Sequence, residues 1–201
     1  MPRQSARIIN SLSRTAGFPC STKTMVRAVA LACFAGSTLP ALALPSGGQV
    51  AAGTAVIGAA ANNRMQIDQS SQKAVLNWQG FSIAGNESVH FQQPAGGVAL
   101  NRVLGTDPSA LFGSLSATGK LFLVNPNGVF FGPGASVDVG GLVASTLNLS
   151  NNDFLSGNYR FINGGAAGSI VNQGNLHAAD GGYVALLAPE VRNEGVVSAR
   201  M

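Results

Sequence analysis

Cysteine and histidine are both scarce, and their scarcity excludes several classes of protein. The only cysteines are Cys20 and Cys33, so the sequence after residue 33 offers no disulfide framework, thiol nucleophile or cysteine-based metal site. The only histidines, His90 and His177, are far apart in the sequence and form no pair at a metal-ligand spacing. We therefore expect no metal, no cofactor and a fold held together by packing and backbone hydrogen bonds.

Charge is also scarce, at 10% of residues, and it is unevenly distributed. Five of the twelve basic residues precede residue 28, where there is no acidic residue; they are Arg3, Arg7, Arg14, Lys23 and Arg27. From Leu44 onward seven basic residues stand against eight acidic ones, a net charge of −1. The basic isoelectric point therefore belongs to the N-terminal segment, and we expect no nucleic-acid partner. A hydrophobic content of 46% argues against intrinsic disorder.

The N-terminal segment has the pattern of a long signal peptide. A basic region over residues 1–27 precedes an apolar stretch over 28–41, and Ala41-Leu42-Ala43 matches the small-x-small pattern of signal-peptidase sites. The pattern predicts a signal peptide over residues 1–43, cleaved between Ala43 and Leu44. Gly36 and Pro40 interrupt the apolar stretch, which is too short to span a bilayer, so we expect export and no stable membrane insertion.

After the leader the sequence is typical of short strands and turns. Pairs of large apolar residues separated by one position recur between residues 65 and 91, which is the period of a strand with one buried face. Asn125-Pro126-Asn127-Gly128 lies between two apolar runs and has the composition of a tight turn, with proline second and glycine last. Residues 107–113, which begin Asp-Pro, predict a helical turn or a corner.

An internal repeat indicates how these strands are arranged. Residues 172–178 recur as 193–199, 21 positions later, and residues 141–144 recur as 182–185, 41 positions later, close to two such periods. A period near 20 made of short strands and Gly/Asn turns predicts an all-β parallel β-helix with asparagines stacked at its turns. The 158 residues after position 43 would form about seven coils. A jelly roll or sandwich is the alternative fold, and the second copy of the repeat ends in mid-coil.

Five motifs extend the prediction to a family. The chain resembles the secretion domain of two-partner secretion exoproteins of the filamentous haemagglutinin family, and within it the high-molecular-weight adhesins and haem–haemopexin-binding proteins. The motifs are residues 76–83 (LNWQGFSI), 86–91 (NESVHF), 100–103 (LNRV), 125–132 (NPNGVFFG) and 141–147 (GLVASTL). The resemblance implies a right-handed parallel β-helix with an N-terminal cap over residues 44–201.

The resemblance also implies a function and a partner. Such a domain crosses the periplasm and is recognised there by the POTRA domains of a dedicated outer-membrane β-barrel transporter, then folds outside a Gram-negative cell as an extracellular or surface-associated monomer. By resemblance, secretion and transporter recognition are assigned to residues of two motifs, namely Asn101, Arg102, Asn125, Pro126, Asn127 and Gly128. For Asn125 and Asn127 the alternative is that they only build the turn. The activity of any longer exoprotein and its host receptor stay open.

Two other functions fit the predicted fold. A β-helical polysaccharide lyase or hydrolase needs clustered carboxylates, but the eight acidic residues after Leu44 are scattered; Asp138 and Asp180, 42 residues apart, are the one pair expected to stack, two coils from each other. A free-standing adhesin that binds host-surface glycans is the other alternative. Neither has a motif of its own, and we expect no enzymatic activity.

Overall fold

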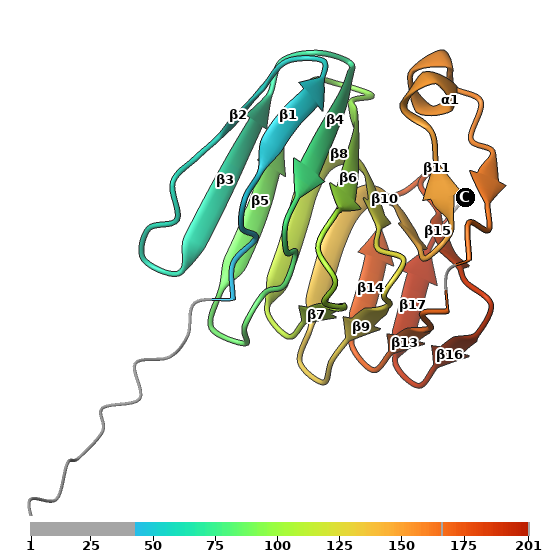
Figure 1. The fold of residues 1–201 in the computed structure, drawn as a ribbon. Helices are drawn as coiled ribbons and strands as arrows, with labels where there is room; N and C mark the ends of the chain where they lie inside the picture. Colours follow the sequence, from blue (N-terminus) through green and yellow to red (C-terminus); the bar gives the residue numbers. More distant parts are fainter. Residues whose placement is uncertain (1–42, 166, 201) are drawn as a thin grey trace, which may run out of the picture. The chain divides into compact units, whose positions relative to one another are not determined.

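The computed structural model describes residues 43–165 and 167–200, which form short strands and one helix (Figure 1). The N-terminal strands are β1 (Gln49–Ala52), β2 (Ala55–Ile57), β3 (Arg64–Gln69), β4 (Lys73–Trp78), β5 (Ser88–Gln92) and β6 (Val98–Val103). The central elements are β7 (Ser109–Leu111), β8 (Ser114–Val124), β9 (Val129–Phe131), β10 (Ser136–Ser145), β11 (Asn148–Leu149), α1 (Asn151–Ser156) and β12 (Phe161–Ile162). The last strands are β13 (Ile170–Asn172), β14 (Asn175–Ala178), β15 (Val184–Leu187), β16 (Val191–Asn193) and β17 (Val196–Ala199).

The strands wind into a parallel β-solenoid with three faces. Face A stacks β3, β5, the first half of β8, the first half of β10, β14 and β17, each parallel to the next. Face B stacks β4, β6, the second halves of β8 and β10, and β15. Face C stacks β7, β9, β13 and β16. The predicted parallel β-helix is therefore confirmed, and the sandwich alternative is excluded.

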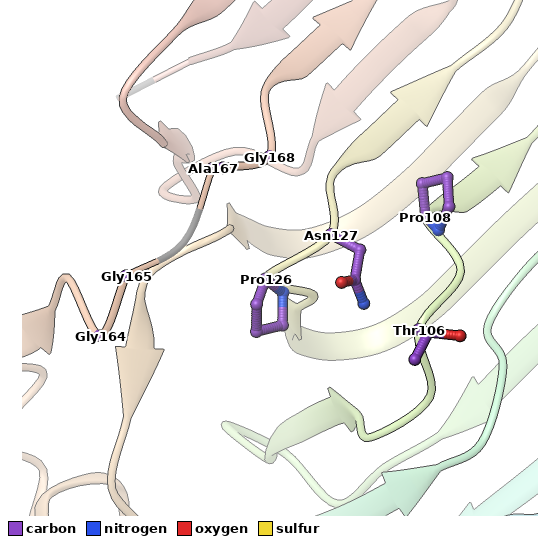
Figure 2. A pocket seen from close by; sticks show the side chains of 8 residues that line it. All are labelled: Thr106, Pro108, Pro126, Asn127, Gly164, Gly165, Ala167 and Gly168. Atoms are coloured by element: carbon purple, nitrogen blue, oxygen red, sulfur yellow. The ribbon is translucent and has the colours of Figure 1, made fainter.

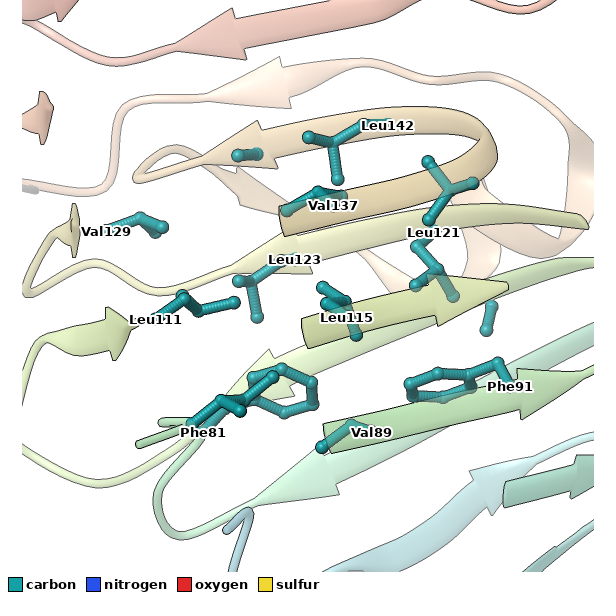
Figure 3. Packing of buried hydrophobic residues seen from close by; sticks show 14 of the residues in the cluster. Phe81, Val89, Phe91, Leu111, Leu115, Leu121, Leu123, Val129, Val137 and Leu142 are labelled. Carbon is teal, nitrogen blue, oxygen red and sulfur yellow. The ribbon is translucent and has the colours of Figure 1, made fainter. Parts of the chain in front are cut away.

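The interior is filled by alternate side chains of all three faces. The expected pairs around Ile67, Trp78, Phe81 and Phe91 are buried, with at most 2% of each side chain exposed. Figure 3 shows Leu115, Leu121, Leu123, Val137 and other labelled side chains meeting inside the coil. Fully burying one such side chain contributes about 1.5–3 kcal/mol, so stacked rows of them supply the main stabilising term in the described part of the chain, which contains no cysteine.

An antiparallel cap closes the first coil, as the resemblance implied. β1 pairs antiparallel with β4, and β2 pairs antiparallel with β3, so the residues that precede the first coil cover its open strand edges. An uncovered edge would present free backbone donors and acceptors to other chains. The cap also gives the following coils a completed surface on which to stack.

The number of coils and one register differ from the expectation. The 21-residue repeat is confirmed, since Asn172 pairs with Asn193. The expectation that residues 141–144 and 182–185 lie two coils apart is wrong. β10 pairs directly with β14 and β15, so the two copies lie in adjacent coils. The register is also displaced by one residue, with Leu142 opposite Val184. Face A consequently has six parallel rungs in the described part of the chain, corresponding to about six turns rather than seven.

The missing coil is an excursion that leaves the solenoid after β10 and returns at β13. It contains the antiparallel pair β11–β12 and α1, which starts at the N-cap Ser150 and ends at Gly157 in the left-handed conformation. Phe154 of α1 is buried and its ring lies 5.6 Å from that of Phe122 on the outer side of face B. A second apolar cluster therefore forms outside the solenoid and holds the excursion against it.

Buried amides connect neighbouring coils at the corners. Gln93 Nε2 donates to Gln69 Oε1 at 3.0 Å, and Gly119 N donates to Gln93 Oε1 at 3.1 Å. Asn172 Nδ2 donates to Asn193 Oδ1 at 2.7 Å, which confirms the expected asparagine stacking. Each bond satisfies at least one polar side chain that would otherwise be buried without a partner, namely Gln69, Gln93 or Asn172. They fix how one coil sits on the next.

Residues 107–113 do not form the expected helical turn. Ser109–Leu111 form strand β7, and only the bends before it make the expected corner. The chain extends there because parallel pairing with β9 satisfies its backbone groups. No helix in the described ranges is long and apolar enough to cross a membrane.

Candidate functional site: the corner between faces B and C

The Asn-Pro-Asn-Gly sequence forms the corner that leads from β8 on face B to β9 on face C. Gly128 N donates to Asn125 O at 3.1 Å, which closes a four-residue turn with Pro126 in the second position. Gly128 has φ +120°, which favours glycine, and a side chain added there would meet Ser169 O at 3.1 Å. The predicted turn is confirmed.

Asn125 lies at the centre of this corner and is completely buried. Its side-chain amide donates to Asp107 O and Ser109 Oγ on the preceding coil, both at 3.0 Å. Its side-chain oxygen accepts from Asn127 N at 3.0 Å, and its backbone N donates to Ser145 O on the following coil at 2.9 Å. One asparagine therefore joins three successive coils, because its short side-chain amide supplies two donors and an acceptor.

Pro126 and Asn127 are the exposed half of the turn. Asn127 Nδ2 donates to Gly105 O at 2.8 Å and to Asn125 Oδ1 at 3.1 Å. Beside these residues is a hollow of about 510 Å³ (Figure 2), with Thr106 and Pro108 on one side and a glycine-rich part of the excursion on the other. The corner thus divides into a buried half that binds the coils together and an exposed half that other molecules can reach.

The other predicted recognition residues, Asn101 and Arg102, do not lie on this corner. Asn101 is 1% exposed and points into the core, where its Oδ1 accepts from Trp78 Nε1 at 3.0 Å. Its Nδ2 lies 3.5 Å from Phe122 O on the next coil. In the folded domain Asn101 therefore positions Trp78 and is closed to a partner.

Arg102 is half-buried on face B and holds the excursion. Its Nη1 donates to Asn151 Oδ1 at 2.7 Å and its Nη2 donates to Leu149 O. Burial lowers the pKa of the Arg102 guanidinium from its usual value. Lys73, one strand away, donates to Leu155 O at 2.7 Å and to Phe154 O at 3.1 Å. Arg102 therefore holds the segment that leads into α1, and Lys73 binds carbonyls of its last turn. No pattern in the sequence predicted either contact.

Thr146 is a residue of this region that the sequence did not single out. It is fully buried, its hydroxyl oxygen has no hydrogen-bond partner, and it lines a second hollow of about 220 Å³ with Pro126, Asn148 and Gly164. Thr146 is the next-to-last residue of the 141–147 motif and directly follows β10, but nothing in the motif distinguishes a buried hydroxyl from an exposed one.

The predicted cleavage point lies where the description of the chain begins. Residues 1–42 are outside the described residues, so the leader and its cleavage stay predictions. Leu44 is buried, and Ala43 N donates to Glu87 Oε1 at 2.9 Å. Glu87 Oε2 accepts from Ala84 N at 2.7 Å, so both oxygens of this carboxylate, on a residue only 3% exposed, accept hydrogen bonds from backbone amides.

The scattered acidic residues do not converge on the corner or elsewhere in the described ranges. The expected stacking of Asp138 on Asp180 is wrong, because Asp138 stands opposite His177 and the two side chains are 2.9 Å apart. The 42 residues between the aspartates contain the excursion and not a full extra coil. Within residues 43–165 and 167–200 there is no group of three or more potential metal ligands. His177 is an outward strand residue opposite Ser198, as predicted.

Comparison with known proteins places this geometry in a family. The chain matches the TPS secretion domain family over residues 41–201. It is 38% identical over 165 residues to the heme/hemopexin-binding protein of Haemophilus influenzae strain KW20 Rd, covering 78% of this chain and 18% of that protein. A second heme/hemopexin-binding protein of Haemophilus influenzae is 41% identical over 110 residues, which cover 54% of this chain and 12% of that protein.

A solved structure shows the same architecture. The HMW1 secretion domain from Haemophilus influenzae superposes with a TM-score of 0.70 at 33% identity, covering 77% of this chain and 42% of that one. The chain spans less than a fifth of the length of the curated relatives it matches. Exoproteins of this family are exported across the outer membrane, and membership of the family implies an outer-membrane transporter as partner. The chain belongs to the family of TPS secretion domains, the two-partner secretion domains of exported proteins.

Proposed function

We propose that this chain directs export by presenting the Asn125–Gly128 segment, in its unfolded form, to the POTRA domains of a cognate outer-membrane transporter. The β-solenoid then forms coil by coil outside the cell. The observation that carries the proposal is the burial of Asn125 in the folded corner, with bonds to Asp107 O, Ser109 Oγ and Asn127 N. A segment that is accessible when extended and half-buried when folded can be bound before folding and is withdrawn from its partner by folding.

The pattern of strand pairing supports folding in the order of emergence. Each rung of face A pairs with the rung before it, and outside the excursion the paired residues are about one coil apart; Arg64 pairs with Ser88, and Asn175 pairs with Val196. The cap β1–β2 closes the first coil from its N-terminal side. Every new coil therefore finds a complete template in residues that have already emerged. The hydrogen bonds and buried area gained at each coil favour forward movement of the chain.

The composition of the exported part suits passage through a pore. Residues 44–201 contain no cysteine, so no disulfide forms in the periplasm and locks the chain before transport. Charges are few, which reduces the cost of moving the extended chain through a narrow channel. The proposal includes no catalytic step, because the carboxylates are dispersed and Asp138 faces His177 rather than a second acid.

The relatives are named for haem and haemopexin binding, and the proposal does not assign that activity to this chain. Both histidines lie on the open outer surface of face A. His90 Nδ1 is 2.8 Å from Ser116 Oγ, and His177 Nδ1 is 2.9 Å from Asp138 Oδ1. Neither lies in an apolar pocket of the kind that encloses a haem.

The proposal is tested by comparing two variants of the corner in cells that express the transporter. Asn127→Gly keeps the turn and leaves the Asn125 bonds to the preceding coil intact, while removing the exposed amide. If the POTRA domains bind this segment, the Asn127→Gly chain accumulates in the periplasm although its purified form is stably folded. Normal export of Asn127→Gly would show that the segment only builds the turn. Ser116→Ala, on the outer surface of face A, is the matched control and should be exported normally.

A further inference from the structure

A third concave surface lies away from the corner between faces B and C, where face C turns into face A. This surface, the serine groove, has a volume of about 420 Å³, within the range of ligand sites. Its lining is polar and comes from three successive coils and the turn before β3; the residues are Asn62, Asn63, Arg64, Gly85, Asn86, Glu87, Ser88, Gly113, Ser114, Gly134 and Ser136.

The floor of the serine groove is a row of hydroxyl groups in register. Ser88 is paired with Ser114, and Ser114 with Ser136, so the three side chains stack along the solenoid axis. Adjacent rungs are about 4.8 Å apart. Asn175 follows Ser136 in the same row on the next coil. The floor therefore presents polar groups at a constant repeat along one line.

These floor groups have no intramolecular partners among the described residues, unlike the next outward row of the same face. In that row His90 is bonded to Ser116 and Asp138 to His177. The side chains of Ser88, Ser114 and Ser136 make no such bonds. Each hydroxyl can donate one hydrogen bond and accept two, which makes this row available to a polar ligand.

One end of the serine groove carries a free positive charge. Arg64 is exposed and forms no ion pair within the described ranges, and it follows Asn62 and Asn63, whose left-handed backbone (φ 49° and 60°) makes the turn into β3. The only carboxylate of the lining, Glu87, is buried and accepts a bond from Ala84 N. The guanidinium is thus the exposed charged group of the groove, and a guanidinium can bind a carboxylate with two parallel bonds.

The geometry points to the serine groove as a binding site for a linear oligosaccharide that carries carboxylates. The sugar chain lies along the solenoid axis, its hydroxyls bond to the serine row, and one uronate carboxylate pairs with Arg64. A peptide fits less well, because the lining has no apolar pocket for a side chain and its floor offers side-chain hydroxyls rather than a free strand edge. The site is open to solvent, so the affinity expected is weak, with a Kd of about 0.1–1 mM.

The experiment titrates the purified, folded chain with a hyaluronan hexasaccharide and follows backbone amide shifts by NMR. The expected result is a saturable change confined to the groove residues. Arg64→Gln weakens binding about tenfold, and the double variant Ser114→Ala, Ser136→Ala weakens it about fivefold, as loss of one charge-assisted or two neutral bonds implies. Ser116→Ala, in the row that is already paired, leaves binding unchanged. All four substitutions are at exposed or partly exposed side chains, and circular dichroism checks that each variant folds.

Several results would overturn the inference. They are the absence of saturable shifts in the groove, equal binding by Arg64→Gln and the parent, and equal binding of neutral cellohexaose. Tighter binding of an acidic peptide of similar length would assign the groove to a protein partner instead. Because the titration uses folded protein in solution, its outcome is independent of whether the transporter recognises the Asn125–Gly128 segment.

Discussion

Replacing Asn125 by alanine is the sharpest test of how the corner is built. The substitution removes the donors to Asp107 O and Ser109 Oγ and the acceptor for Asn127 N, all with bonds of 3.0 Å. A net hydrogen bond contributes about 0.5–1.5 kcal/mol, and a buried group left without a partner costs about 1–3 kcal/mol. Because Asn125 is fully buried, water cannot replace the lost bonds without rearrangement. The free energy of unfolding should fall by about 2–4 kcal/mol.

The matched comparison is Asn127→Gly, two residues away. Asn127 is exposed, and its main loss is the 2.8 Å bond to Gly105 O, for which water substitutes. We expect a cost of about 1 kcal/mol. The assay is urea unfolding of the purified chain followed by circular dichroism, with thermal melting as a second measure; Asn125→Ala should melt about 5–15 °C lower than the parent. A loss for Asn125→Ala no larger than that for Asn127→Gly would refute the assignment of the coil-joining role to Asn125.

Three further predictions concern other parts of the fold. Arg102→Met should loosen the excursion, because the bonds to Leu149 O and Asn151 are lost. The expected result is faster proteolysis between residues 156 and 165, with little change in the cleavage of faces A and C. Gln93→Ala should lower the free energy of unfolding by about 2–3 kcal/mol, because Gly119 N loses its buried acceptor; a loss below 0.5 kcal/mol would contradict this. Burial, with a smaller contribution from Tyr159, raises the pKa of Tyr183 above its usual value of 10.0. The stability that the protonated Tyr183 contributes is therefore present below pH 10 and is lost at higher pH. Tyr183→Phe should remove that alkaline loss, measured by urea unfolding from about pH 8 to 11.

The sequence predicted those features of the fold that repeat over short distances. The 21-residue recurrence places Asn172 opposite Asn193 because the two coils it connects contain no insertion. The same reasoning wrongly placed two coils between residues 141 and 185. The excursion is about as long as a coil, and its small and polar residues are similar in composition to those of a coil. Matching Gly141 to Gly182 also set the register one residue away from the pairing of Leu142 with Val184. In a strand such a shift exchanges the inward and outward faces.

The candidate site was predictable in its chemistry and not in its contacts. Proline in the second and glycine in the fourth position favour a turn through local backbone preferences, and residues 125–128 form one. The burial of Asn125 depends on Ser109 and Asp107, which come from the preceding coil and are identified only once the coils are stacked. Asn101 likewise reads as a polar strand residue, but its partner Trp78 lies one coil away in the core. Interactions between coils are therefore the part that local sequence patterns do not contain.

Release of the chain from cells that contain or lack the cognate transporter tests the central claim most directly. The measurement is the fraction of the chain in the culture medium and in the periplasm, by immunoblot, with the transporter gene intact or deleted and a periplasmic enzyme as the leakage control. The account predicts release only when the transporter is present, and retention in the periplasm when it is deleted. Equal release in both strains would contradict it.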